Sequence, residues 1–318
     1  MFPLSYRCLT FVAAFLFAVG CGDNGSVPEA QQQPTTIAPA EVLQLPTFSE
    51  GPVFDYDGNL FVSHGPHITK LTPAGMSSVW IELDGPNGHK VLPDGTHLVC
   101  EPKRHAVLHV AADGGILGNA SSECSGEPLR APNDLTLDLQ GGFYFTDPGG
   151  SRDAPIGTVH YVDAEGVTHL AAGGLRVPNG LVLRQDGATL LVSETVPNRI
   201  LEFPVIAPGE LGPMRVFADL PSKEGVAAEP DGLALDSQGN LYVAHLNMAA
   251  VEVLDPQGKL LRSLPGGNYD VSNLVFGGPA LSRLFITGSV GNRSDTAGRI
   301  YRLDLDGVRG VSSLLSRR

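Results

Sequence analysis

The most regular feature of this chain is a short-range alternation of hydrophobic and polar residues that recurs in runs from about residue 50 onward. Each run has alternate apolar residues, then a turn rich in Gly, Asp or Asn, and then a returning run of β-branched or aromatic residues. A period of two predicts strands with one buried face, and turns of this composition predict hairpins. No segment shows a convincing period of 3.6 residues, so we expect almost no helix.

This hairpin pattern occurs six times, beginning at Glu50, Asn87, Asn133, Asn179, Asp231 and Asn273. Successive starts are 37, 46, 46, 52 and 42 residues apart, which is the period of a four-stranded propeller blade. A third strand follows each hairpin, as in residues 67–75, and a weaker fourth precedes the next unit, as in residues 167–173. The sequence therefore predicts an all-β, six-bladed β-propeller with four antiparallel strands per blade. Either residues 40–45 or residues 311–315 would complete the last blade, and the pattern leaves both open.

The N-terminal segment differs from the repeats. Residues 1–20 contain Arg7 and an apolar run from Leu9 to Val19, which is typical of a secretory signal peptide. The residues before Cys21 resemble the cleavage box of bacterial lipoproteins, so we expect Cys21 to be lipidated; an ordinary cleaved signal with an incidental Cys is the alternative. Residues 21–40 are predicted to be a disordered tether and residues 41–318 the propeller. We accordingly expect a periplasmic or cell-envelope lipoprotein that meets the membrane only through its N-terminal lipid.

The composition narrows the classes of partner. The formal net charge is −13, and removal of residues 1–20 makes it one unit more negative because Arg7 is lost and no acidic residue is. With no basic patch, nucleic-acid binding is excluded, whereas cation binding is compatible with this charge. We expect a monomer. Cys100 and Cys124 either form a disulfide or remain two buried thiols, and their spacing does not decide between the two.

The repeat also predicts a ring of oxygen ligands. The first strand of each propeller blade lines the central channel, so the residues that open the six units should surround the axis. All six carry side-chain oxygens, and none is His or Cys. Carboxylate and carboxamide oxygens suit a hard cation such as Ca²⁺, although Zn²⁺, Mn²⁺ or Fe²⁺ are alternatives, and Glu50 with Asp231 would balance one divalent ion. The competing interpretation is that these residues simply open strands after turns.

A second ring is predicted about fourteen residues further on, where the returning strands end near the same mouth of the channel. Its members are His64, Glu101, Asp147, Glu194, His245 and Gly288. The three acids are candidates for substrate contact or for support of the ligands, and the two His residues for proton transfer. The alternative for each is an exposed loop residue.

Five motifs, in order and at blade spacing, resemble the gluconolactonase and regucalcin (senescence marker protein) family. They are EGP at Glu50, NDL at Asn133, PNGL at residues 178–181, PDGLALD at residues 230–236 and FGG at residues 276–278. The similarity runs from about Glu50 to Asp306 and implies a six-bladed propeller with one catalytic metal in the channel. It implies Glu50, Asn179 and Asp231 as metal ligands, Asn133 as a ligand of metal or substrate, and Asp231 also as catalytic base or nucleophile.

Two departures from the family pattern bear on the substrate. Arg130 lies three residues before Asn133, whereas sugar-lactone members have an Arg two residues before their Asn, and His64 stands where relatives often have Asp. The residues expected to contact substrate are Asn133, Arg130, Asn87, His64, Asp147 and Glu194.

The function predicted from these features is metal-dependent hydrolysis of a small lactone or ester. The metal would polarise the carbonyl, and Asp231 would activate a water or attack directly. The chain has no G-x-S-x-G, H-E-x-x-H, P-loop or G-x-G-x-x-G motif. Two alternatives stay open, namely an aryl-ester or phosphotriester hydrolase using the same site, and a non-catalytic surface propeller that binds a ligand or protein. A strictosidine-synthase-like propeller is disfavoured because that type lacks the Glu-Asn-Asp set.

Overall fold

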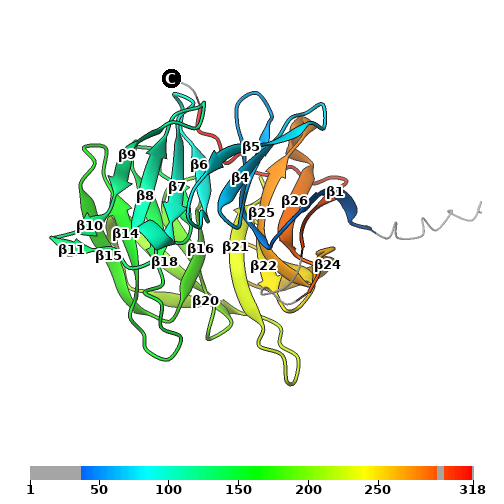
Figure 1. Ribbon diagram of the computed structural model, residues 1–318. Helices are drawn as coiled ribbons and strands as arrows, with labels where there is room; N and C mark the ends of the chain where they lie inside the picture. Colours follow the sequence, from blue (N-terminus) through cyan, green and yellow to red (C-terminus); the bar gives the residue numbers. More distant parts are fainter. Residues whose placement is uncertain (1–36, 292–296, 317–318) are drawn as a thin grey trace, which may run out of the picture. The chain divides into compact units, whose positions relative to one another are not determined.

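The computed structural model describes residues 37–291 and 297–316. Over these residues the chain forms a ring of six antiparallel sheets (Figure 1), which confirms the predicted six-bladed β-propeller. Besides the strands there are two short 3₁₀ helices in this part of the chain, η1 (Pro102–Arg104) and η2 (Pro279–Leu281). The expected signal peptide, Cys21 and most of the tether lie outside the described residues. None of the helices described is both long and apolar enough to span a membrane.

Each blade takes its strands in chain order from the channel outward, except that the N-terminal strand is the outermost strand of blade 6. The strands of blades 1 to 3 are β2 (Ser49–Phe54), β3 (Leu60–His64), β4 (His67–Leu71) and β5 (Ser77–Glu82); β6 (His89–Val91), β7 (His97–Glu101), β8 (Ala106–Val110) and β9 (Ile116–Ser121); and β12 (Leu135–Leu137), β13 (Phe143–Asp147), β14 (Gly157–Val162) and β15 (Thr168–Leu175). A small two-stranded sheet of β10 (Glu123–Cys124) and β11 (Glu127–Pro128) stands between blades 2 and 3 in the sequence.

The other three blades follow the same plan. Their strands are β16 (Pro178–Leu183), β17 (Thr189–Glu194), β18 (Arg199–Ala207) and β20 (Arg215–Asp219), with β19 (Glu210–Leu211) also on β18; β21 (Glu229–Leu235), β22 (Leu241–Leu246), β23 (Ala250–Leu254) and β24 (Leu260–Pro265); and β25 (Asp270–Gly277), β26 (Arg283–Ser289), β27 (Gly298–Asp304) and β1 (Ala40–Leu45).

The N-terminal strand closes the ring. β1 pairs with β27 and is the outermost strand of blade 6, so residues 40–45 rather than 311–315 complete the propeller. Pairing the first strand with the last blade ties the two ends of the domain together.

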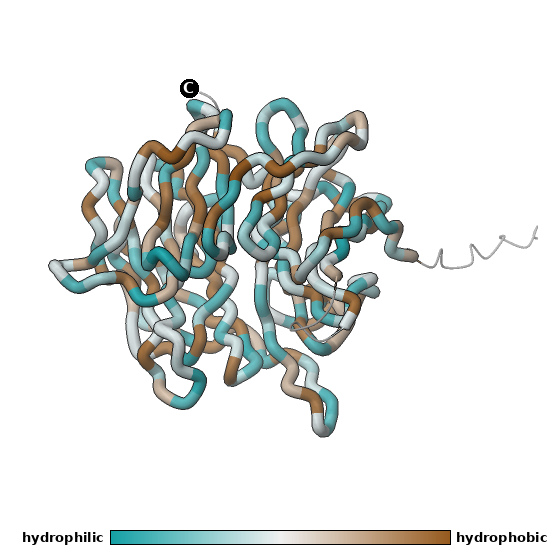
Figure 2. The backbone as a smooth tube through the Cα atoms, viewed as in Figure 1, coloured by the Kyte–Doolittle hydropathy of each residue, from teal (hydrophilic) through white to brown (hydrophobic). Residues whose placement is uncertain are grey.

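Hydrophobic residues fill the spaces between neighbouring blades. The core separates into six clusters, each formed mainly by the facing sides of two successive blades; one of them joins blade 6 to blade 1 through Leu45, Leu60 and Ile300. Figure 2 shows the hydrophobic residues concentrated along the strands and the hydrophilic ones in the connecting loops. Strands such as β3 and β13 are buried at every residue, so both of their faces pack against neighbouring blades and the single buried face expected from the alternation is not found there.

Aspartates hold the hairpin turns at the far end of the strands. The carboxylate of Asp55 accepts from the backbone N–H groups of Asp57 and Asn59 at 3.0 and 2.8 Å, and Asp236 bonds Gln238 and Asn240 in the same way at 2.9 Å. Gly58 takes a φ of 80°, which favours glycine. The turns are therefore fixed by local side-chain bonds.

Cys100 and Cys124, the two cysteines among the described residues, are free thiols. Cys100 is buried, and burial raises the pKa of its thiol well above the usual range. The Cys124 thiol donates to the Thr168 carbonyl at 3.6 Å. Of the two possibilities left open by the sequence, the structure has the unpaired thiols.

Candidate metal and substrate site

The side chains expected at the axis occupy equivalent places at the start of the inner strands. The pairings Leu181–Val192, Leu233–Val243 and Leu274–Ile286 align the inner strands of blades 4 to 6. In this register Asn179 and Asp231 share one position. The other members of the ring are Glu50, Asn87, Asn133 and Ser272.

The sixth member differs from the expectation. Ser272 rather than Asn273 occupies the ring position of blade 6, because Leu274 aligns with Leu181 and Leu233. Asn273 takes the next position, where blades 4 and 5 have glycines. Ser272 and Asn273 are adjacent polar residues, and only the pairing of β25 with β26 shows which of them takes the ring position.

β-Bulges lie at the ring in four blades. The register shifts fall between Glu50 and Val53, Pro178 and Leu181, Pro230 and Leu233, and Val271 and Leu274. A bulge interrupts the strict alternation of side chains and re-aims one of them, and bulges are common beside functional sites. The bulges therefore allow consecutive residues at the strand start to serve the channel.

Hydroxyl groups from neighbouring blades hold the ring backbone. Ser63, Thr146 and Ser193 each stand one residue before the end of a second strand. They donate to the carbonyls of Asn87 at 2.8 Å, Asn179 at 2.7 Å and Asp231 at 2.7 Å, each in the next blade. These bonds between blades were not predicted, although Ser or Thr precedes the second-ring residue in four of the six repeats.

Glycines allow the inner strands to approach closely. A Cβ on Gly51 would collide with the Asn87 carbonyl, and one on Gly180 with the Asp231 carbonyl. The Gly that follows the ring residue in several repeats is thus required by the spacing around the axis.

The ring has a donor set that fits a hard divalent cation. Glu50 and Asp231 contribute carboxylates, and Asn133 and Asn179 contribute amide oxygens from two further blades. Asp231 is 2% exposed. Among the described residues no three His, Cys, Asp or Glu side chains gather as a metal-binding group, and the ring itself holds only two of these types. Oxygen donors and two negative charges match the preference of calcium more closely than that of soft metals.

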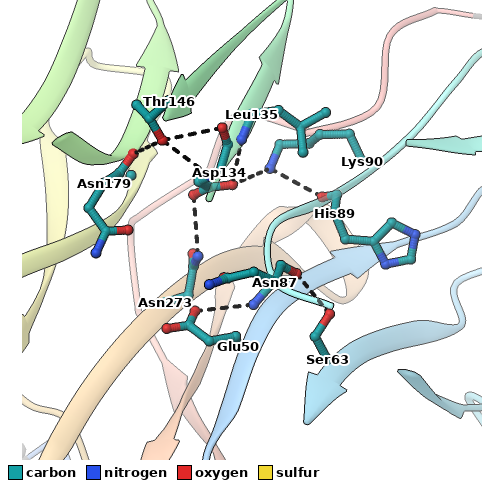
Figure 3. Close-up of polar contacts among 12 residues, drawn as sticks. Glu50, Ser63, Asn87, His89, Lys90, Asp134, Leu135, Thr146, Asn179 and Asn273 are labelled. Atoms are coloured by element: carbon teal, nitrogen blue, oxygen red, sulfur yellow. Dashed lines mark hydrogen bonds and ion pairs between the residues drawn. The ribbon is translucent and has the colours of Figure 1, made fainter. Parts of the chain in front are cut away.

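A polar cluster follows one position deeper in the channel. Asn273 donates to Asp134 at 3.3 Å, and the Lys90 ammonium lies 3.8 Å from the other Asp134 oxygen (Figure 3). Burial raises the pKa of the Asp134 carboxyl, and Lys90 opposes that shift. Figure 3 shows Glu50 and Asn179 close to this cluster, so residues from five blades meet here. Lys90 and Asp134 were not predicted from the sequence, since neither position is polar in every repeat.

The opposite end of the channel is covered by the C-terminal segment. Residues 311–316 line a cavity of about 320 Å³ together with apolar residues at the far ends of the inner strands. Leu235 accepts a hydrogen bond from the Val311 N–H at 2.9 Å, and Tyr56 donates to the Leu315 carbonyl at 2.8 Å. This segment therefore lies over the far end of the channel, away from the strand starts that carry the ring.

The acids of the second ring bind backbone rather than facing open space. Asp147 accepts from the N–H groups of Arg130 at 2.7 Å and Ala131 at 2.9 Å, and these two residues lie just before Asn133. Asp147 is 2% exposed. It therefore fixes the segment that enters the inner strand, as a supporting residue would.

Glu101 and Glu194 repeat this arrangement in their own blades. Glu101 accepts from the N–H groups of Asp84 and Gly85 at 3.2 and 3.0 Å. Glu194 accepts from the Arg176 N–H at 2.7 Å and also pairs with Arg199 at 2.7 Å. In three of the six blades, therefore, a second-ring carboxylate binds the backbone just before the ring residue.

The histidines of the second ring are bonded within the propeller. His64 shares a hydrogen bond with Thr69 at 2.7 Å, and burial, followed by His67, lowers its pKa. His245 is fully buried and contacts Asn198 at 2.9 Å. Gly288 completes this ring.

Arg130 is exposed, and its guanidinium donates to the Ile156 carbonyl at 2.9 Å. Asn87 and Asn133 are half-buried members of the first ring. Of the residues expected to contact substrate, these three combine exposure with a place at the mouth.

Comparison with known proteins gives a consistent result. A family model described as the SMP-30/Gluconolactonase/LRE-like region matches residues 48–290. The chain is 28% identical over 275 residues to a gluconolactonase of Zymomonas mobilis, covering 76% of each protein. It is 25% identical over 240 residues to a diisopropyl-fluorophosphatase of Loligo vulgaris, covering 66% of this chain and 76% of the relative. A solved structure of a gluconolactonase from Xanthomonas campestris superposes with a TM-score of 0.72 at 28% identity, covering 83% of this chain and 88% of the other.

Proposed function

Because this chain belongs to the SMP-30/gluconolactonase/LRE-like family, we propose that it hydrolyses a small lactone at the mouth of its channel, with a divalent metal held by the first ring. The observation that carries this proposal is the equivalent placement of Glu50, Asn133, Asn179 and Asp231 at the starts of four inner strands. Similarity to a gluconolactonase supports the lactone as the substrate class.

Glu50, Asn133, Asn179 and Asp231 would hold the ion, and calcium suits their oxygen donors best. When bound, such an ion supplies Lewis-acid polarisation of the substrate carbonyl. The Asp231 backbone is already fixed by Ser193, and Thr195 donates to the neighbouring Pro230 carbonyl at 2.9 Å. A residue whose backbone is held in this way needs little main-chain reorganisation when ion and substrate bind.

The chemical role assigned to Asp231 is that of general base. Its carboxylate accepts a proton from the water whose oxygen bonds to the lactone carbonyl carbon. The ring carbon–oxygen bond then breaks, and the proton passes from Asp231 to the departing alkoxide, so the product is an open hydroxy acid. Direct attack by Asp231 on the carbonyl is the alternative chemistry at the same atom.

The remaining expected residues serve binding and support. Asn87, Asn133 and Arg130 would contact the substrate at the mouth. The bonding of Asp147 and Glu194 favours a supporting role, and His64 borders the same rim from within blade 1.

The test combines metal analysis of the purified protein with a panel of lactones, aryl esters and phosphotriesters, each assayed with and without chelator. We expect one divalent ion per chain, hydrolysis of at least one lactone, loss of that activity with chelator and its recovery on adding calcium. Full activity after complete metal removal would contradict the metal assignment. A metal-loaded protein that hydrolyses none of the panel would instead be a binding propeller.

A phosphotriester substrate is the second candidate. It is favoured by the 25% identity to a diisopropyl-fluorophosphatase, which covers 76% of that relative. A phosphotriester centre would use the same oxygen ligands, and a higher kcat/KM for phosphotriesters than for lactones in the same panel would select it.

We also propose that residues 1–20 direct export and that Cys21 carries lipid, so that the protein is a monomeric cell-envelope lipoprotein. The apolar run from Leu9 to Val19 and the small residues before Cys21 support this. In cells fed an alkyne fatty acid, the wild-type protein should take up the label and Cys21→Ser should not. Equal labelling of both would overturn the assignment.

A further inference from the structure

Two arginines occupy the same repeat position at the mouth. Arg130 and Arg176 each stand three residues before a ring residue, Asn133 and Asn179 respectively. Their backbone N–H groups are both held at 2.7 Å by second-ring acids, Asp147 and Glu194. Both side chains therefore extend from rigid backbone beside the candidate metal site.

Both guanidinium groups bind one loop. Arg130 donates to the Ile156 carbonyl at 2.9 Å, and Arg176 donates to the Arg152 carbonyl at 3.1 Å. Arg152 in turn lies 2.5 Å from Glu229, two residues before Asp231. The loop of residues 148–156, which follows β13 in blade 3, thus reaches across blade 4 to blade 5.

Some of the arginines near this loop pair with a carboxylate, and others do not. Arg152 pairs with Glu229, and Arg199 pairs with Glu194. Among residues 37–291 and 297–316, no carboxylate forms an ion pair with Arg130 or Arg176, whose acceptors are main-chain carbonyls. A carbonyl satisfies an N–H group but does not neutralise its charge.

The side chain of Arg176 also retains donor capacity. Its Nε is buried and has no acceptor within the described structure. Of its remaining N–H groups, only Nη2 bonds the Arg152 carbonyl. Guanidinium groups match oxyanions through paired hydrogen bonds, and both of these are held on one loop.

We propose that Arg130 and Arg176 bind an acidic substituent of the substrate, so that the preferred lactone carries a second oxyanion, a carboxylate or a phosphate, away from its ring carbonyl. This inference rests on the proposed lactone hydrolysis and names the substrate class of that site. A chain with a net charge of −13 repels such a substrate at long range, so the local pair of cations determines whether it binds.

The kinetic test compares three matched probes, D-glucono-1,5-lactone, its 6-carboxylate counterpart D-glucaro-1,5-lactone and 6-phospho-D-glucono-1,5-lactone. We expect kcat/KM for at least one anionic lactone to exceed that for the neutral one by about tenfold or more, equivalent to about 1.4 kcal/mol. The arm that shows the preference identifies the acidic group. The preference should weaken as salt is raised.

Arg176→Gln and Arg130→Gln should each lower this ratio by about tenfold, and Arg176→Lys should restore part of it. Arg215→Gln is the matched control, because it removes one positive charge from an exposed pair with Glu202 on the outer strands of blade 4. A wild-type ratio near one, or a ratio unchanged in both Arg→Gln variants, overturns the proposal.

Equilibrium binding separates this proposal from the proposed function. Calorimetry with D-gluconate, D-glucarate and 6-phosphogluconate requires no hydrolysis. Tighter binding of an anionic probe that is lost in Arg176→Gln supports the arginine site even if no lactone is cleaved. Lactone hydrolysis without any such difference supports the function and rejects the arginine site.

Discussion

The two rings of polar side chains at the mouth carry the same kinds of atoms and use them differently. Glu50 and Asp231 of the first ring open inner strands around the axis, where register shifts interrupt the alternation of side chains. Asp147 and Glu194 of the second ring are turned to backbone N–H groups within their own blades. Among carboxylates only one strand apart, Asp147 and Glu194 thus support the backbone, whereas Glu50 and Asp231 are the proposed ligands.

The largest effect should come from the first ring. Asp231→Asn keeps the volume and removes the charge, so we expect kcat/KM for the lactone to fall by about 10³-fold. The free energy of unfolding should change by less than about 1.5 kcal/mol because the two side chains have nearly the same size.

The measurements are lactone kinetics and urea unfolding on the same preparations. Asp304→Asn is the control, since Asp304 is an exposed residue paired with Arg283 and Arg302 on the outer strands of blade 6. Full activity of Asp231→Asn with metal still bound would remove Asp231 from the chemistry.

A substitution in the second ring should lower stability more than it lowers kcat, the reverse of the effect expected in the first ring. Asp147→Ala leaves the N–H groups of Arg130 and Ala131 without their acceptor, which should cost about 2 to 3 kcal/mol of unfolding free energy. Asp147→Asn keeps one acceptor oxygen and should recover part of that loss. Activity should fall mainly through KM, because the segment before Asn133 loses its anchor. If Asp147→Ala lowers kcat as Asp231→Asn does while stability holds, the division between the rings is wrong.

A third contrast lies two residues along the inner strand from the ring. At this position blade 2 has His89, where the other blades have Pro52, Leu135, Leu181, Leu233 and Leu274. His89 bonds His97 at 2.7 Å, and both are buried. Burial lowers the pKa of His89 well below its usual range and that of His97 to about 4.

This pair predicts acid sensitivity. The imidazole groups of His89 and His97 both stay neutral in the folded chain. In the unfolded chain they are protonated below about pH 6.5, so the unfolded state binds more protons. The stability that they contribute is complete above pH 6.5 and is lost as pH falls toward 4. We expect a loss of about 4 kcal/mol between pH 7.5 and pH 5 by urea unfolding, about 2 kcal/mol from each histidine. The double variant His89→Leu/His97→Leu should flatten this dependence, and an equal slope in wild type and variant would exclude the pair as its source.

The smallest effect should come from the hydroxyls between the rings. Ser193→Ala removes the donors to the carbonyls of Asp231 and Gly180 and should cost about 1 kcal/mol of unfolding free energy. It should also weaken calcium binding a few-fold, because the Asp231 backbone is less firmly held. The exposed Ser312→Ala provides a reference, and equal calcium affinity in both variants would show that the hydroxyl serves stability alone.

Much of the fold was predictable because its causes are local. Alternation, turn residues and the 37- to 52-residue spacing of the repeats correctly predicted six four-stranded blades. The same repeat logic placed Glu50, Asn179 and Asp231 at equivalent strand positions. It missed Lys90 and Asp134, which have no counterparts of their type in the other blades and meet only across the channel.

The amino-acid order was sufficient for the elements, their number and the residues that open each inner strand, because period, turn chemistry and repetition act over a few neighbouring residues. Strand pairing and side-chain packing join residues that are distant along the chain, so only the tertiary structure determines them. Strand pairing places Ser272 rather than Asn273 at the ring position of blade 6, and it makes residues 40–45 the strand that closes the propeller. Packing directs the carboxylates of Asp147 and Glu194 to backbone N–H groups. Folding also attached Arg130 and Arg176 to one loop, since the partner of each side chain depends on which strands the completed circle brings side by side.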